Sequence, residues 1–127
     1  MIKKFEEIIA WQRARGLCNH IYAVTKNQSF SKDFGLKDQV QRSSVSIMSN
    51  IAEGFERGSN KEFIQYLYIA KGSCGEMRSQ LYVALDQQYI LTEEFDKLAK
   101  LVSETSRLIY HLIESLKVSK FKGTKFK

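Results

Sequence analysis

Proline is absent from all 127 positions of this chain. A protein of this length with average composition would contain about six prolines, at about 5% of residues. Proline interrupts a helix because it lacks a backbone donor and its ring collides with the preceding turn. The chain is therefore free to form long helices, and its length suits one hydrophobic core.

Apolar residues recur at spacings of three and four in four long segments, the pattern of an amphipathic helix. This predicts helices over residues 8–25, from 36 to the glycines at 54 and 58, from 60 to about 87, and from 92 to 116. The expected core stripes comprise Ile8, Trp11, Ala14, Leu17, Cys18, Ile21 and Tyr22; Leu36, Val40, Ser44, Ile47, Ile51 and Phe55; Phe63, Leu67, Ala70, Cys74, Met77, Leu81 and Ala84; and Phe95, Leu98, Val102, Thr105, Ile109, Leu112 and Leu116.

The connections between these segments are short. Residues 27–35 collect Asn, Ser, Asp and Gly without a period and predict a loop. Ser59 and Glu62 have the spacing of a capping box, and Thr92 is the expected N-cap of the last helix. Helices joined by such links must run back along their neighbours, and no segment alternates like a strand. The sequence predicts an all-α protein, an up-down-up-down antiparallel four-helix bundle.

The positive charge is concentrated at the C-terminal end. The whole chain has a formal net charge of +6, whereas residues 1–116 carry fifteen basic and fourteen acidic side chains. We therefore expect a bundle domain over 1–116 and a flexible basic tail over 117–127. Lysines can neutralise phosphates and phenylalanines can stack on bases, which makes the tail a candidate nucleic-acid-binding segment. Its candidate residues are Lys117, Lys120, Phe121, Lys122, Lys125, Phe126 and Lys127.

The motifs of common catalytic and cofactor sites are missing from the sequence. Cys18 and Cys74 have no CxxC or Cys/His partner spacing, and neither His20 nor His111 follows a glutamate at the three-residue spacing of di-metal bundles. No phosphate-binding glycine loop, signal peptide or membrane-length apolar run is present. We expect a cytoplasmic protein that is not an enzyme and needs no cofactor, metal or membrane.

A polar stripe follows the second predicted helix at an angle to its apolar face. It comprises Gln39, Ser46, Asn50, Glu53 and Arg57, with Arg42 just outside. These groups suit hydrogen bonding within or between bundles, a solvated face, or phosphate contact by Arg42 and Arg57, and the pattern leaves these alternatives open.

The third predicted helix contains glycines at 72 and 75. A glycine inside a helix costs about 1 kcal/mol relative to alanine, so each needs a structural reason. The segment with Gly72, Ser73 and Glu76 would let another helix approach closely. We favour packing within the chain over a subunit contact, because every bundle needs the first.

The second and third helices together carry a specific resemblance. The sequence is similar to the four-helix-bundle family also called 23S rRNA intervening sequence proteins over about residues 5–115. The matching residues are Phe5, Trp11, Gln12, Gly35, Leu36, Gln39, Arg42, Val45, Ser46, Ile47, Ser49, Asn50, Ile51, Ala52, Glu53, Gly54, Arg57, Ser59, Glu62, Phe63, Leu67, Ile69, Ala70, Gly72, Ser73, Glu76, Gln80, Leu81 and Ala84.

The resemblance implies a left-handed bundle that assembles into a ring, commonly a homopentamer, in a bacterial cytoplasm. Members are encoded within sequences inserted in ribosomal RNA genes or as separate genes, and their function is generally unassigned. A related bundle is the accessory protein of diversity-generating retroelements, whose basic ring binds nucleic acid and a reverse transcriptase. This chain departs from the family pattern at Met48, at Ser43 and Ser44, and at 87–89, where Gln-Gln-Tyr replaces a Gly-Tyr turn.

Two functions remain after these observations. In the first, the protein binds RNA or DNA through Arg42, Arg57 and the tail. In the second, it is a homo-oligomeric interaction or assembly module that organises a protein partner, and the tail only solvates it. Charge and the resemblance favour the first.

Overall fold

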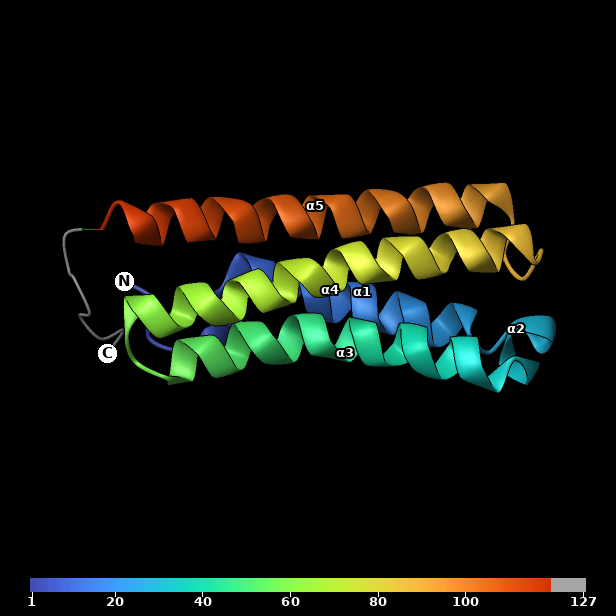
Figure 1. Ribbon diagram of the computed structural model, residues 1–127, viewed down its shortest axis with the longest axis horizontal. Helices are drawn as coiled ribbons and strands as arrows, with labels where there is room; N and C mark the ends of the chain where they lie inside the picture. The colour runs from blue at the N-terminus through green and yellow to red at the C-terminus, as the bar shows by residue number, and fades with distance from the viewer. Residues whose placement is uncertain (120–127) are drawn as a thin grey trace.

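The computed structural model describes residues 1–119, and all of their regular secondary structure is helical (Figure 1). The elements are η1 (Phe5–Glu7), α1 (Ile9–Val24), α2 (Gln28–Lys32), α3 (Phe34–Glu56), α4 (Asn60–Asp86) and α5 (Thr92–Lys117). The four long helices alternate in direction, each packs on the next, and α5 closes the bundle against α1 (Figure 1). The predicted all-α four-helix bundle is confirmed.

The core lies along the bundle axis and follows the predicted stripes closely. Every predicted core residue of α3 and α4 is buried. On α1, Trp11 and Cys18 are only half-buried, and Tyr22 is 41% exposed. On α5, Leu116 is buried as predicted, but Ile113 is buried in place of Leu112, because a step of four after Ile109 keeps the stripe on the core side of a 3.6-residue helix.

The segment predicted as a loop over 27–35 contains the short helix α2, and that prediction was wrong. Phe30 of α2 is fully buried and stacks on Tyr89 with ring centroids 5.3 Å apart, so burial of one aromatic side chain orders the segment. Helix α3 also begins earlier than predicted, at Phe34. The Asp33 carboxylate accepts the backbone N–H of Leu36 at 3.1 Å and so caps the first turn.

The turn between α3 and α4 occupies only residues 57–59. Gly58 has a φ of 87°, a backbone conformation that costs glycine little and other residues more. The Ser59 hydroxyl accepts the backbone N–H of Glu62 at 3.3 Å, which confirms Ser59 as the N-cap. The Glu62 carboxylate accepts from the Ser59 hydroxyl at 3.2 Å, whereas the predicted capping box would pair it with the Ser59 backbone N–H. This tight turn places α3 and α4 side by side (Figure 1).

Gly54 is the glycine that allows close helix approach within the chain. A Cβ atom added there would lie 2.6 Å from the Cβ of Tyr66 and 3.1 Å from a ring carbon of Phe63. At Gly72 and Gly75, which we expected to fill this role, no such atom lies within 4 Å of the added Cβ. The expectation of close packing at Gly72 within the chain was therefore wrong, because that part of α4 faces outward.

The turn between α4 and α5 is closed by a Schellman motif, in which two backbone N–H groups bond back to the end of α4. Tyr89 N–H donates to the Ala84 carbonyl and Gln88 N–H to the Leu85 carbonyl, both at 2.9 Å. Gln88 occupies the left-handed position of this motif with a φ of 63°. The N-cap of α5 is Leu91 rather than the predicted Thr92, and its N–H donates to the Glu94 carboxylate at 3.0 Å.

Candidate functional site

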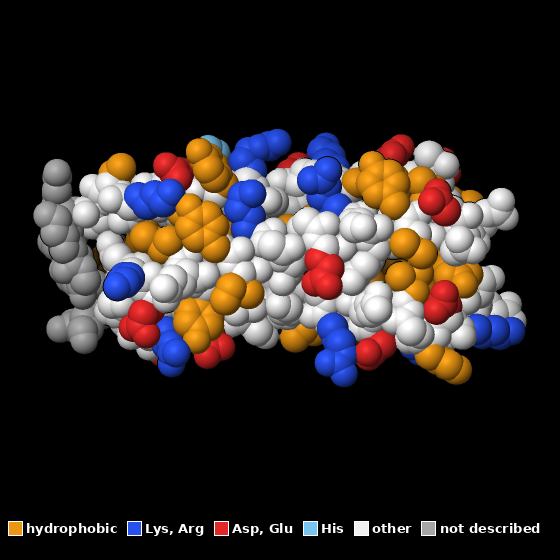
Figure 2. All heavy atoms as spheres, in the orientation of Figure 1, with side chains coloured by type: hydrophobic (Ala, Val, Ile, Leu, Met, Phe, Trp, Pro, Cys, Tyr) orange, Lys and Arg blue, Asp and Glu red, His pale blue; other side chains and the backbone are white. Residues whose placement is uncertain are grey.

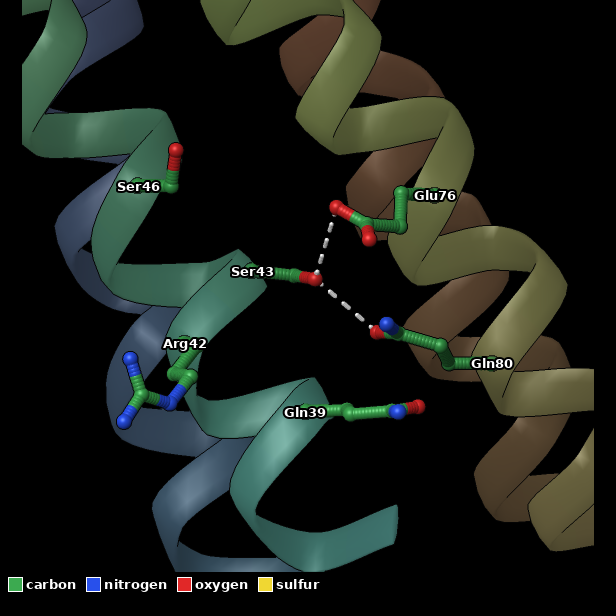
Figure 3. Close-up of a pocket in the computed structure, with 6 residues that line it drawn as sticks. All are labelled: Gln39, Arg42, Ser43, Ser46, Glu76 and Gln80. Atoms are coloured by element: carbon green, nitrogen blue, oxygen red, sulfur yellow. Dashed lines mark hydrogen bonds between the residues drawn. The ribbon is translucent and has the colours of Figure 1, made fainter. Parts of the chain in front are cut away.

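A polar pocket of 350 Å³ lies between α3 and α4 (Figure 3). Its lining residues are Gln39, Arg42, Ser43, Ser46, Glu76 and Gln80. The buried Ser43 hydroxyl lies 2.9 Å from Oε1 of Gln80 and 3.3 Å from Oε1 of Glu76. The Arg42 guanidinium turns away from α4 in Figure 3 and binds Asp38 on its own helix at 2.8 Å. The pocket is therefore organised by hydrogen bonds that join two helices of one chain.

The rest of the predicted polar stripe also bonds within the chain. Ser46 and Ser73 join α3 to α4 through hydroxyls 3.0 Å apart. The Asn50 amide donates to the Ser46 carbonyl at 2.8 Å, and Tyr66 donates to the Glu53 carboxylate at 3.2 Å. Ser46 and Glu53 thus form hydrogen bonds between α3 and α4, whereas the Asn50 bond lies within α3.

The structure does not bring the predicted phosphate-binding arginines together. Arg42 and Arg57 are fifteen residues apart on one helix axis, about 22 Å. The Arg57 side chain lies 3.6 Å from the Glu62 carboxylate and 5.2 Å from the centre of the Tyr66 ring. Each arginine already has an acidic partner, which offsets its attraction for phosphate.

Of the tail residues predicted to bind nucleic acid, only Lys117 falls within the described part of the chain. It is the last residue of α5, and its Nζ lies 3.4 Å from the Glu114 carboxylate and 5.5 Å from the centre of the Tyr68 ring. A hydrogen bond with Tyr68 and the negative charge of Glu114 raise the pKa of Lys117, which keeps it cationic. Lys120, Phe121, Lys122, Lys125, Phe126 and Lys127 lie outside the described residues.

A basic groove that the sequence reasoning missed lies between α4 and α5. Its 280 Å³ hollow is lined by Lys71 and Arg78 of α4 and by Ser103, Ser106, Arg107 and Tyr110 of α5. No carboxylate lines the hollow, and within residues 1–119 none of its three cations forms a salt bridge. Figure 2 shows basic side chains gathered over α5 and the adjoining edge of α4, with aromatic rings among them.

The α4 side of this groove follows a second stripe with helical spacing. Tyr68, Lys71, Gly75, Arg78 and Tyr82 are separated by three, four, three and four residues, so they share one face of α4. Both tyrosines contact α5: Lys117 lies over the Tyr68 ring, and the Tyr82 ring lies 4.8 Å from that of Phe95. We define the basic groove as the seam between this stripe and Ser103, Ser106, Arg107 and Tyr110 of α5.

The spacing of the α4 stripe was visible in the sequence. The third cation of the groove, Arg107, lies on α5, about 30 positions after Arg78, and no sequence pattern links the two. Guanidinium, ammonium and hydroxyl groups that converge on one hollow are all hydrogen-bond donors. Because no acid lines the hollow to neutralise them, they suit an anion with several oxygen atoms, such as a phosphate. The basic groove is therefore the candidate functional site.

The other reactive side chains of the described region are dispersed. Within residues 1–119 no three His, Cys, Asp or Glu side chains lie close enough to hold a metal ion. Burial raises the pKa of the Cys74 thiol to about 12, so this cysteine stays protonated and unreactive at neutral pH. In the same region no helix combines the length and the hydropathy needed to cross a bilayer.

Comparison with known proteins relates the chain to one family. The family model described as "23S rRNA-intervening sequence protein" matches residues 6–111. A solved structure from Bacteroides thetaiotaomicron, described as a protein with unknown function from the S23 ribosomal protein family, is similar to the chain with a TM-score of 0.76. The two share 25% sequence identity over 84% of this chain and 99% of the other. No curated protein matches the chain.

Proposed function

Because this chain belongs to the 23S rRNA-intervening sequence protein family, we propose that it is a non-enzymatic bundle protein that binds RNA or other nucleic acid through a basic surface and its C-terminal tail. The observation that carries the proposal is the basic groove. Three cations and two serine hydroxyls there converge on one hollow without a lining carboxylate. A polyanion with regularly spaced phosphates is the partner that such a surface attracts most strongly.

The distribution of basic side chains supports nucleic-acid binding better than the net charge does. Residues 1–119 contain sixteen basic and fourteen acidic side chains, so the bundle as a whole is almost neutral. Attraction for a polyanion therefore depends on the segregation of cations into the groove and of lysines into the tail. Lys117 stands where the two meet, at the end of α5 beside Tyr68.

Salt dependence of RNA binding tests the proposal. Each phosphate contact contributes about 0.7 to 0.9 to the slope of log affinity against log salt. The triple variant Lys71→Ala, Arg78→Ala, Arg107→Ala should therefore lower the slope by about 2 to 3. Deleting residues 117–127 should lower the slope for duplex RNA by a further 3 to 4 or so.

A matched control removes the same charge elsewhere. The triple variant Lys26→Ala, Lys32→Ala, Lys37→Ala takes three cations from in and around α2 and should change the slope by less than about 1. An equal loss in both triples would show that only net charge matters and would refute the groove as the site. Absence of RNA binding by the wild-type protein at 50 mM salt would refute the proposed function itself.

A second candidate function is homo-oligomeric assembly into a ring, with five copies as the family resemblance implies, serving a protein partner. The outward face of α4 favours it. Ile69 and Val83 are 52% and 43% exposed there, and Gly72 faces open space where alanine would make a better helix. Light scattering at micromolar concentration tests this candidate, and a species of about 15 kDa would refute it.

A further inference from the structure

We propose that the basic groove is built for a single-stranded nucleic acid, whose phosphates lie on Lys71, Arg78 and Arg107 and whose bases stack on Tyr68 and Tyr82. The inference rests on the proposed function and adds the class of strand that the groove accepts. The preference for a single strand is inferred from the two tyrosines, because cations alone bind duplex and single-stranded nucleic acid alike. Unpaired bases offer ring faces to an aromatic side chain, whereas a duplex keeps those faces stacked inside.

The order of residues along α4 matches this use. Tyr68 and Tyr82 stand at the two ends of the stripe with Lys71 and Arg78 between them, so the tyrosines are fourteen residues, or about 21 Å, apart. The groove therefore offers an aromatic ring at each end and cations in the middle. A strand lying along it can place phosphates at the centre while a base at each end turns onto a ring.

The tyrosines are held in place yet remain accessible. Tyr68 and Tyr82 are 48% and 53% exposed. Each is braced on the α5 side, Tyr68 by Lys117 and Tyr82 by the ring of Phe95. A braced ring loses little rotational freedom when a base stacks on it, which lowers the entropy cost of binding. Tyr110, 46% exposed, adds a third ring within the hollow itself.

The space in front of Gly75, on the α4 side of the groove, is open. Gly75 lies between Lys71 and Arg78 on the stripe, and a Cβ atom there would meet nothing within 4 Å. Alanine at this position would favour the helix by about 1 kcal/mol, so its absence is not explained by the stability of α4. Without a side chain between Lys71 and Arg78, a phosphate can approach both cations.

The test measures anisotropy of labelled 15-nucleotide oligouridine and of a blunt 15-base-pair RNA duplex at one salt concentration. The wild-type protein should bind the single strand more tightly. Tyr68→Leu and Tyr82→Leu keep apolar bulk but remove the ring face, and each should weaken single-strand binding about 10-fold. Duplex affinity should change less than about 2-fold, since stacking plays no part in it.

Two glutamate variants of α4 form the matched control. Gly75→Glu places a carboxylate between the groove cations and should weaken single-strand binding about 10-fold, whereas Gly72→Glu, with the same charge change on the outward face, should weaken it about 2-fold. Circular dichroism confirms that each variant is folded.

The outcomes separate the two proposals. Three results would overturn the single-strand inference and leave the proposed function intact. They are equal affinity of the wild-type protein for both RNA forms, equal effects of the tyrosine variants on both forms, and equal effects of Gly75→Glu and Gly72→Glu. No binding of either RNA would overturn both.

Discussion

Gly54→Ala tests whether the contact between α3 and α4 is as tight as the structure indicates. The added Cβ would lie 2.6 Å from the Cβ of Tyr66, where carbon atoms normally stand about 3.5 to 4.0 Å apart. Neither Tyr66 Cβ nor the Phe63 carbonyl oxygen, 3.3 Å away, belongs to a flexible end of a side chain. The two helices would therefore have to part locally by about 1 Å to restore an ordinary contact.

Two opposing terms set the size of the effect. Alanine gains about 1 kcal/mol of helix propensity over glycine. Overpacking a close-packed contact costs about 1 to 3 kcal/mol, and the rigid atoms at Gly54 place it at the upper end. The net expectation is a loss of about 2 kcal/mol in the free energy of unfolding. Gly75→Ala, where nothing obstructs the methyl group, should instead gain up to about 1 kcal/mol.

Urea unfolding followed by circular dichroism measures both variants at one protein concentration, because self-association would shift the midpoint. With a denaturant slope of about 2 kcal/mol per molar, Gly54→Ala should lower the midpoint by about 1 M and Gly75→Ala should raise it. If Gly54→Ala were as stable as the wild-type protein, the close approach of α3 and α4 at this point would be refuted.

Three further predictions concern the helix ends and the buried thiol. Ser59→Ala removes the N-cap of α4 and should lower the free energy of unfolding by about 1 kcal/mol in the same urea assay. Gln88→Gly removes the strain of a left-handed backbone conformation and should raise the free energy of unfolding by up to about 1 kcal/mol. The pKa of Cys74 is about 12 when folded and lower when unfolded, so stability should be flat below about pH 8 and fall as the pH rises toward 12. Consistent with this, iodoacetamide at pH 9 should label Cys74 only in urea, as mass spectrometry would show.

The fold was largely predictable from the spacing of apolar residues, because a long helix must bury one continuous stripe. Where prediction failed, a single side chain outweighed the local pattern. Phe30, surrounded by loop-forming residues, is buried against Tyr89 and orders α2, and no periodicity in five residues could have signalled this. Asp33 lies in the segment whose composition predicts a loop, yet it caps α3.

The site was less predictable, because it depends on which helices are neighbours and on how their faces are turned. Helical spacing places the polar stripe of α3 on one face of the helix, but only the structure shows Ser46 bonded to Ser73 of α4. Lys71 and Arg107 belong to segments with no joint pattern in the sequence. The ion pair of Arg42 with Asp38, at 2.8 Å, joins residues four apart on one helix, so its spacing was visible in the sequence.

The three-residue turn at Gly58 has a consequence for domain swapping between copies of this chain. Helices of 23 and 27 residues meet there, and the bend depends on a backbone angle that favours glycine. A residue that prefers helical geometry at 58 would favour one continuous rod about 80 Å long. Two such rods could each supply the half-bundle that the other lacks, giving a domain-swapped dimer. An oligomer formed by a Gly58 variant would thus report exchange of hairpins between chains and not the ring.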